Sequence, residues 1–379
     1  MTALKILHVF RAPVGGLFRH VLDLAREQAV RGHKVGLICD SGTGGPRAES
    51  QLGDLAPSLA LGLSRYPMHR QPHPGDCLAL LHVSARIAQT QPDIIHGHGA
   101  KGGAYSRLAF NRPSAVRAYI PHGGSLLFGE HTLAGKVYLT TERLLMRRGD
   151  LFLFESEFSA GNFKRKLGVP SSGIMRVVHN GVPPAEFEPV APRPDATDLV
   201  FIGEMRKLKG VDLLIEAVAR LRREGRSLTA TLFGDGPDRA EFTAQAERLA
   251  LNDLITFKRA TPAREAQSFG RLMVMPSRID SMPYVVLEAA ASCKPLLATR
   301  VGGIPEIYGP FVDRLVPPED AGALAQAISR ALDRWNETLA LAREMQARVS
   351  AHFSLGVMVD GVVAAYQAAL ENLRKAGRR

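Results

Sequence analysis

Cysteine and long apolar runs are scarce in this chain of 379 residues, and each scarcity excludes a class of protein. The three cysteines, Cys39, Cys77 and Cys293, lie far apart without CxxC spacing, which argues against metal ligation and favours buried, reduced thiols. No apolar run is long enough to span a bilayer, because Gly, Pro or a charged residue interrupts each one. The N-terminal residues lack the pattern of a secretory signal. We therefore expect a cytoplasmic protein.

Acidic residues are outnumbered by lysine and arginine, which gives a net charge of +11. Such a balance is typical of proteins that meet nucleic acid, anionic membranes or phosphorylated ligands. The basic residues form only small, scattered clusters, without the aromatic runs or zinc-finger spacing of nucleic-acid modules. The composition therefore favours an acidic ligand or a peripheral contact with an anionic membrane, and no nucleic acid.

The chain length fits two domains, and apolar segments alternate with amphipathic ones through most of it. This alternation predicts an α/β fold with two Rossmann-like domains, each built on a parallel sheet covered on both faces. Two Gly/Pro-rich segments, 41–57 and 64–74, predict mobile surface loops around a short strand. Five prolines between 183 and 194 predict a linker. The predicted division is an N-terminal domain over 1–184, a Pro-rich linker over 185–197, a C-terminal domain over 198–352, and a crossover helix with a basic tail over 353–379.

The most informative stretch is a strand, loop, helix, strand, loop pattern over 272–306. Asp280 lies in the loop before the helix, and Glu288 lies about one turn inside it. Carboxylates at the carboxyl ends of parallel strands face the crevice in which open α/β sheets bind ligands, and they suit sugar or ribose hydroxyls. The spacing alone is equally compatible with Asp280 as a helix cap and Glu288 as the partner of an arginine.

Glycine-rich turns and cations mark other strand ends. The segment Gly203–Gly210 joins a predicted strand to a helix and carries Arg206, Lys207 and Lys209, which favours a diphosphate clamp over a solvated basic loop. The tight turn at Gly234, Asp235 and Gly236 suits backbone contact with a base or phosphate, although ordinary turns share its sequence. Gly15 and Gly16 open the first helix, where N–H groups attract an anion, but the GxGxxG dinucleotide fingerprint is absent.

Three histidines, His96, His98 and His122, end predicted strands. An HxH pair can bind a metal, but carboxylates at suitable spacing are absent, so polar packing at a strand end is the preferred interpretation for His96 and His98. His122, followed by two glycines, is the stronger candidate for a site because its strand end directs it into the crevice.

Together these motifs resemble the family 4 glycosyltransferases of the GT-B type over nearly the whole chain. The resemblance rests on Gly15-Gly16, His122-Gly123, Asn180-Gly181-Val182, the 203–210 and 234–237 segments, and the Asp280 to Glu288 stretch with Val301 to Glu306. It implies two Rossmann-like domains that face a central cleft, with a C-terminal helix crossing back to the N-terminal domain. It also implies sugar transfer from a nucleotide-diphosphate sugar with retention at the anomeric carbon, without a metal or other cofactor.

By the same resemblance, Arg206 and Lys209 hold the diphosphate and Glu288 holds the ribose hydroxyls. Asp280 and the backbone of Ser281, Met282 and Pro283 hold the donor sugar, which His122 contacts near the reacting carbon. Two residues depart from the family pattern. Asp280 stands where the family has Glu, and Glu204 stands where it has Arg.

The expected enzyme is a hexosyltransferase that extends a cell-surface polysaccharide or lipopolysaccharide, with a UDP-sugar favoured over a GDP-sugar. Its expected acceptor is a glycan or a lipid-linked glycan at the inner face of the cytoplasmic membrane. Front-face attack, with the leaving phosphate helping to take the acceptor proton, is the mechanism implied by the family. Two alternatives stay open. They are a nucleotide-sugar 2-epimerase on the same fold and a non-catalytic nucleotide-sugar binding protein, the second motivated by Asp280 and Glu204.

Overall fold

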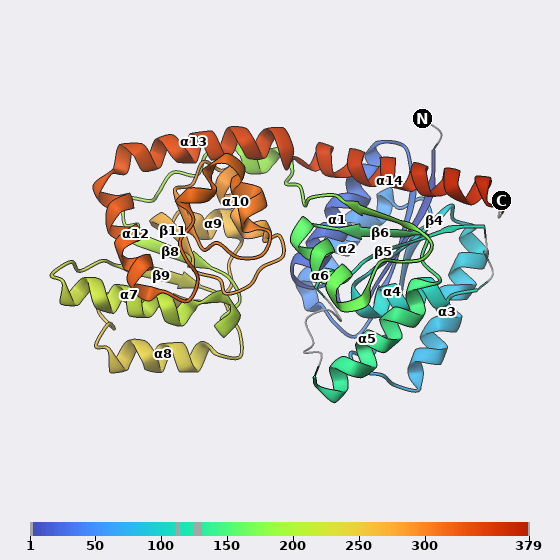
Figure 1. Cartoon of the computed structure of the whole chain (residues 1–379), viewed down its shortest axis with the longest axis horizontal. Coiled ribbons are helices and arrows are strands. Elements are labelled where there is room, and N and C mark those ends of the chain that lie inside the picture. Colours follow the sequence, from blue (N-terminus) through green and yellow to red (C-terminus); the bar gives the residue numbers. More distant parts are fainter. Residues whose placement is uncertain (1–2, 111, 113, 124–130, 378–379) are drawn as a thin grey trace. The chain divides into compact units, whose positions relative to one another are not determined.

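The computed structural model describes residues 3–110, 112, 114–123 and 131–377 (Figure 1). The chain folds into two compact units. Unit 1 comprises Met1–Asn180 together with Leu355–Arg379, and unit 2 comprises Gly181–Ser354. Each unit contains one parallel sheet, as the alternation of apolar and amphipathic segments predicts. The two Rossmann-like sheets of the prediction are therefore confirmed.

The sheet of unit 1 has seven strands in the order β3-β2-β1-β4-β5-β6-β7. Nearly all residues of β1, β4 and β6 are buried, as expected for strands with both faces covered. The strand bounds are β1 (Lys5–Phe10), β2 (Lys34–Asp40), β3 (Gly62–Tyr66), β4 (Ile94–His98), β5 (Val116–Ile120), β6 (Leu151–Phe154) and β7 (Ile174–Val177).

Helices cover both faces of this sheet, and the last helix of the chain is one of them. Figure 1 shows α14, in red, beside α1, and its buried side chains share a core with β1, β4, β5 and β6. The predicted return of the C-terminal helix to the N-terminal domain is therefore confirmed, whereas residues 378–379 of the predicted tail lie outside the described residues. The helices are α1 (Gly15–Val30), α2 (Gly45–Leu55), η1 (Ala56–Ser58), α3 (Gly75–Thr90), α4 (Gly99–Leu108), α5 (Leu133–Met146), α6 (Glu157–Leu167) and α14 (Leu355–Lys375).

The sheet of unit 2 has five parallel strands in the order β10-β9-β8-β11-β12. They are β8 (Thr197–Ile202), β9 (Ala230–Phe233), β10 (Ile255–Lys258), β11 (Gly270–Met275) and β12 (Leu296–Ala298). One large apolar core joins the sheet to its helices. These are η3 (Pro184–Phe187), η4 (Lys207–Lys209), α7 (Val211–Arg223), α8 (Arg239–Arg248), α9 (Ala263–Gln267), α10 (Tyr284–Ala291), α11 (Ile304–Tyr308), η5 (Gly309–Arg314), α12 (Ala321–Asp333) and α13 (Trp335–His352).

Two expectations about irregular segments are wrong. The first Gly/Pro-rich segment contains α2, whose start uses Gly44 and Gly45 at positive φ and Pro46 in the first turn, a position that proline tolerates well. The segment 185–197 is part of unit 2 instead of a separate linker. Its backbone pairs with the unit, from Val190 N to Ser292 O (3.1 Å), and the Arg193 guanidinium lies 4.2 Å from the Phe269 ring centre. The boundary between the units lies after Asn180, earlier than predicted.

Candidate functional site

Three loops of unit 2 meet at the carboxyl ends of its strands. They follow β8 (203–210), β9 (234–238) and β11 (276–283). Backbone hydrogen bonds fix them to one another: Met205 N donates to Asp235 O (3.0 Å), and Arg278 N donates to Leu208 O (2.8 Å). The loops are therefore held together by main-chain contacts, which keep their side chains in fixed positions around this edge of the sheet.

An ion pair links the first and third loops. Lys209 Nζ donates to Asp280 Oδ1 (2.7 Å) and Oδ2 (2.8 Å), and Ser277 Oγ donates to Asp280 Oδ2 (2.9 Å). The side chains of Lys209 and Asp280 are 24% and 13% exposed, so the pair is shielded but reachable from solvent. The structure therefore brings together the two charged residues that the sequence places at these strand ends. The N-cap of α10 is Pro283, so Asp280 does not cap that helix.

Two glycines allow the backbone to pack tightly here. Gly302 has φ +56°, and a Cβ on it would lie 1.5 Å from Asp280 O. Gly210 has φ +70°, and its Cβ would lie 1.9 Å from Pro276 O. Any larger residue at either position would displace the loop that carries Asp280, because the atom it meets is backbone.

Arg278 organises the loop and was missed by the sequence analysis. Its guanidinium binds both carboxylate oxygens of Asp212 at 2.7 Å and both oxygens of Glu319 at 2.8 Å. The hydrogen bonds that Arg278 donates to Asp212, followed by those to Glu319, raise the pKa of Arg278 above its ordinary value. A charged residue in a loop has no periodic pattern, so only the paired acids, 66 and 41 residues away in sequence, reveal its role.

The other two cations of the first loop are more exposed. Arg206 Nη2 lies 3.3 Å from Glu204 Oε1, and these side chains are 45% and 50% exposed. Lys207 Nζ lies 2.8 Å from Glu241 Oε1, also at the surface. Glu204, the residue that departs from the family pattern, therefore partly neutralises Arg206, which the resemblance assigns to the diphosphate.

The predicted donor-binding residues lie along the same three loops and the helix that follows. Gly203 is the first residue after β8, and Gly234, Asp235 and Gly236 lie in the second loop, where Asp235 Oδ2 accepts from Ala260 N (3.1 Å). Ser281 is partly buried and precedes Met282 and Pro283, which are buried. Glu288 is only 5% exposed and lies on α10, one turn after its start. These positions agree with the predicted strand, loop and helix.

The remaining predicted site residues belong to unit 1. Gly15 and Gly16 are the first residues of α1, and Gly15 has φ +66°. His122 follows β5, has φ +48° and is half-buried. The unit 1 residues therefore lie at a strand end and a helix start, as the sequence predicts.

Unit 1 also gathers five histidines, of which the sequence analysis noticed three. His8 and His20 join His96, His98 and His122 in one network of ring contacts. Hydrogen bonds join His8 Nδ1 to His98 Nε2 (2.9 Å) and His98 Nδ1 to His122 Nε2 (3.2 Å). The predicted polar packing of His96 and His98 at a strand end is thus part of a larger cluster.

Burial lowers the pKa of His8 and of His20 from the ordinary value of 6.5 to about 4. Burial also lowers the pKa values of His96, His98 and His122 well below that value. All five imidazoles are therefore neutral at pH 7, and a charged substrate group finds no fixed cation among them.

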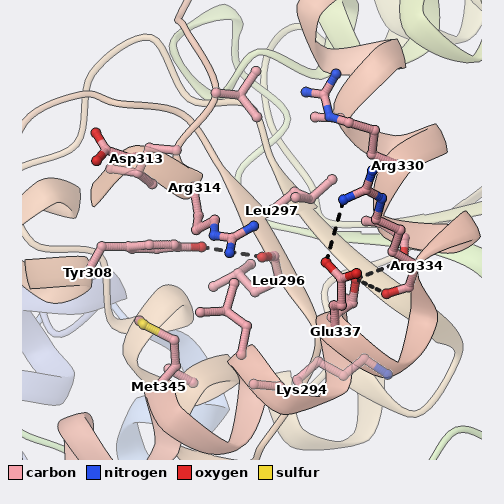
Figure 2. Close-up of a pocket in the computed structure, with 18 of the residues that line it drawn as sticks. Lys294, Leu296, Leu297, Tyr308, Asp313, Arg314, Arg330, Arg334, Glu337 and Met345 are labelled. Atoms are coloured by element: carbon pink, nitrogen blue, oxygen red, sulfur yellow. Dashed lines mark hydrogen bonds and ion pairs between the residues drawn. The ribbon is translucent and has the colours of Figure 1, made fainter. Parts of the chain in front are cut away.

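A pocket of about 260 Å³ lies elsewhere in unit 2 (Figure 2). Figure 2 shows Tyr308, Leu296 and Met345 around it, with the arginines Arg330 and Arg334 on α12 and the residue after it. None of the predicted site residues lines this pocket. It is therefore separate from the strand ends described above.

Two family models match the chain in succession. Residues 14–186 match the model described as Glycosyltransferase Family 4, and residues 196–334 match the model described as Glycosyl transferases group 1. The chain is a family 4-like glycosyltransferase of the GT-B type. The resemblance that the sequence motifs carry is thus confirmed, and so is the type of enzyme: a glycosyltransferase.

Individual relatives share little sequence identity with this chain, but they align with it over nearly their whole length. The glycogen synthase of Mycobacterium tuberculosis is 23% identical and aligns over 96% of this chain and 93% of its own. The Anabaena protein HepE, solved in complex with UDP, has a TM-score of 0.78 at 19% identity and covers 96% of this chain and 100% of its own. WaaG, a glycosyltransferase involved in lipopolysaccharide biosynthesis, has a TM-score of 0.69 at 17% identity, with 95% and 98% covered. These likenesses confirm the GT-B fold.

Among the described residues, no helix combines the length and the apolar character that crossing a membrane demands.

Proposed function

We propose that this glycosyltransferase moves a sugar from a nucleotide-diphosphate sugar to a glycan or a lipid-linked acceptor in the synthesis of a cell-surface polysaccharide or lipopolysaccharide. A UDP-sugar is the proposed donor in preference to a GDP-sugar. The observation that carries this proposal is the Lys209–Asp280 pair, held between interlocked loops at the carboxyl ends of the unit 2 strands. Ligands of open α/β sheets bind at such ends.

Lys209 and Arg206 are the proposed partners of the diphosphate. An ammonium group has three N–H donors, and Lys209 directs its contacts to Asp280 through two short distances, so it can hold Asp280 and donate to a phosphate oxygen together. Positive charge fixed in advance stabilises the leaving diphosphate without reorganisation. Metal-independent transfer follows from this assignment.

The carboxylates take the hydroxyl groups of the donor. Glu288, nearly buried on α10, is the proposed acceptor of the ribose hydroxyls, and Asp280 with the backbone of 281–283 is the proposed site of the sugar. Each ionised carboxylate accepts several hydrogen bonds, which suits adjacent hydroxyls. Glu288 is thus expected to contribute to donor binding, whereas Lys209 contributes to the departure of the diphosphate.

The proposed transfer retains the configuration at the anomeric carbon. The acceptor oxygen attacks from the face that the diphosphate leaves, the bond from carbon to the phosphate oxygen breaks, and the acceptor proton passes to the leaving phosphate. His122 is proposed to contact the sugar near this carbon. Its imidazole is neutral at pH 7 because burial lowers its pKa, so it donates or accepts a hydrogen bond without adding charge.

The relatives and the charge of the chain support the choice of substrates. HepE was solved with UDP, which supports a uridine donor, and WaaG is involved in lipopolysaccharide biosynthesis, which supports a surface glycan. The net charge of +11 supports contact with the anionic inner face of the cytoplasmic membrane, where a lipid-linked acceptor would lie.

Slow hydrolysis of UDP-, GDP- and ADP-sugars by the purified protein in EDTA tests the proposal. One donor should be cleaved with and without EDTA, Glu288→Gln should abolish cleavage, and the exposed Glu337→Gln should retain it as the matched control. Nuclear magnetic resonance of the first released sugar should show the donor's anomeric configuration. Inversion, loss of activity in EDTA, or epimerised donor in place of cleavage would overturn the corresponding part of the proposal. If a donor binds without cleavage, the assay is repeated with membrane extracts, and absence of transfer there would leave a binding protein.

A further inference from the structure

We propose that unit 1 contains a binding site for one divalent transition-metal ion, with Zn²⁺ as the fitting ion, formed by His8, His96 and His98. This site belongs to unit 1, whereas the proposed donor site belongs to unit 2, and it supplies no step of the transfer reaction. Its role is to fix the histidine network of unit 1.

The pairing of two strands places the three imidazoles together. β1 and β4 are parallel neighbours, with His8 opposite His96 and Phe10 opposite His98 in the register. Side chains two residues apart on a strand point to the same face, so His96 and His98 share a face, and the register adds His8 to it. All three ligands thus come from rigid strands in the middle of a seven-stranded sheet.

A separate partner holds the outer nitrogen of each ring. His8 Nε2 lies 2.9 Å from Gln28 Oε1 on α1, and His96 Nδ1 lies 2.7 Å from Tyr366 Oη on α14. His98 Nδ1 lies 3.2 Å from His122 Nε2. Histidine ligands of metals generally donate their second N–H in this way, which fixes the ring and leaves the other nitrogen with its lone pair.

The other ring nitrogen of each of the three histidines lies close to the other two. His8, His96 and His98 each offer one ring nitrogen, and these three atoms lie within 4.8 Å of one another. Zn–N bonds are about 2.0–2.1 Å, so small ring rotations bring all three within bonding reach of one ion. Among the described residues, His96 Nε2 is buried and has no hydrogen-bond partner. A buried nitrogen without a partner is costly, and a metal ion would satisfy it.

The chemistry of the set favours zinc over a hard cation. Three neutral imidazoles suit Zn²⁺, Co²⁺, Ni²⁺ or Cu²⁺, whereas Mg²⁺ and Ca²⁺ require oxygen ligands. Without a metal, one proton occupies the 2.9 Å contact between His8 Nδ1 and His98 Nε2. With a metal, His98 must instead carry its proton on Nδ1 and donate it to His122. The ion would therefore determine the tautomer of both His98 and His122.

A second set, His20, His98 and His122, also offers three nitrogens within 4.8 Å. Both sets require His98 but through opposite ring nitrogens. The first set is favoured because all three of its residues are fully buried on strands, whereas His122 is half-buried in a loop. Variants of His8 and His122 distinguish the two sets.

Metal analysis of the full-length protein tests the site. Protein purified from zinc-supplemented growth without an affinity tag should carry about one zinc per chain by mass spectrometry. His8→Gln and His96→Gln should reduce it to background, while His122→Gln and His82→Gln should retain it. His82 is a control in the same unit, since it is partly buried against Ser64 and lies outside the cluster. Equal zinc in the wild type and His96→Gln, or loss in His122→Gln alone, would overturn the proposed ligand set.

A second measurement needs no variant. Metal-free wild-type protein titrated with Co²⁺ should develop the visible ligand-field absorption of a four-coordinate site and saturate at one equivalent, and added Zn²⁺ should displace it. The same titration should raise the melting temperature by several degrees, because an ion that binds only the folded state stabilises it. A featureless spectrum together with an unchanged melting temperature would refute the site, whatever the outcome of donor hydrolysis.

Discussion

The two parallel sheets present different polar groups towards the carboxyl ends of their strands. Unit 1 collects five imidazoles that burial keeps neutral, whereas unit 2 places lysines, arginines and carboxylates in partly exposed ion pairs. A charged group can be kept at a protein surface at little cost, but a buried one must be paired or neutral. The same fold thus carries charged side chains at the strand ends of unit 2 and neutral imidazoles in unit 1.

The largest expected effect is the loss of folding stability when acid protonates the buried histidines of unit 1. The folded-state pKa values of His8 and His20 are about 4, below the ordinary 6.5, so the unfolded chain binds more protons between these values. The stability that these two neutral histidines contribute is therefore fully present above pH 6.5 and is lost as the pH falls towards 4. At the low end of this window, each of the two pKa shifts lowers the free energy of unfolding by about 3 kcal/mol.

Urea unfolding of the chelator-treated protein between pH 4 and 7 measures this loss. His8→Gln should flatten the pH dependence by about the share of one histidine, while His352→Gln, an exposed residue of α13 in unit 2, should leave it unchanged. Identical pH profiles for the wild type and His8→Gln would show that the cluster does not titrate in this way.

The second prediction concerns a buried ion pair of unit 1. Arg107 is fully buried, donates to Glu142 Oε2 (2.8 Å), and its guanidinium lies 3.8 Å from the Tyr119 ring centre. Arg107→Met removes the buried cation that pairs with Glu142, which should lower the free energy of unfolding by about 3–5 kcal/mol. Arg31→Met, which removes a more exposed pair with Glu27 and Asp360, should cost less than about 1 kcal/mol. Equal costs in denaturant titrations would contradict this contrast.

Elements with a local apolar pattern could be predicted from the sequence. Contacts that depend on the register of neighbouring strands could not. The helix predicted within the 272–306 pattern is confirmed as α10 (Tyr284–Ala291), because its apolar pattern is a local signal. The α2 helix was missed because its glycines and proline, read as loop residues, in fact form the helix start. At this segment the Gly/Pro composition indicates a loop, whereas the local backbone geometry starts a helix.

The site shows the same limit. Asp280 and Lys209 were predicted at strand ends, but their direct pairing joins residues 71 apart in sequence. His8 became visible only through the register that places it opposite His96, and Arg278 only through its acidic partners on other elements. Such contacts depend on which strands are neighbours, and a single sequence carries no local signal for that.

The third prediction concerns the fixed positive charge of Lys209 in unit 2, which contrasts with the neutral imidazoles of unit 1. Lys209→Met removes the cation proposed to stabilise the leaving diphosphate, and loss of one such group typically lowers the rate about 100- to 1,000-fold. We expect this loss in kcat of sugar transfer, with Lys207→Met close to the wild type, because Lys207 pairs with Glu241 at the surface of the same loop. Equal losses in the two variants would mean that the loop provides only general positive charge.

The smallest expected effect comes from the exposed neighbour of the proposed clamp. Glu204 lies 3.3 Å from Arg206, and both side chains are about half exposed, so their interaction is weak and screened by salt. Glu204→Gln should free Arg206 for the diphosphate and lower the Kd of the donor about two- to fivefold at low salt, as expected for an interaction of up to about 1 kcal/mol. Isothermal titration at two salt concentrations measures this, with Glu216→Gln on α7 as a control that removes an equally exposed acid paired with Arg223. If both variants tighten binding equally, net charge acts on the donor, whereas a gain confined to Glu204→Gln assigns the effect to Arg206.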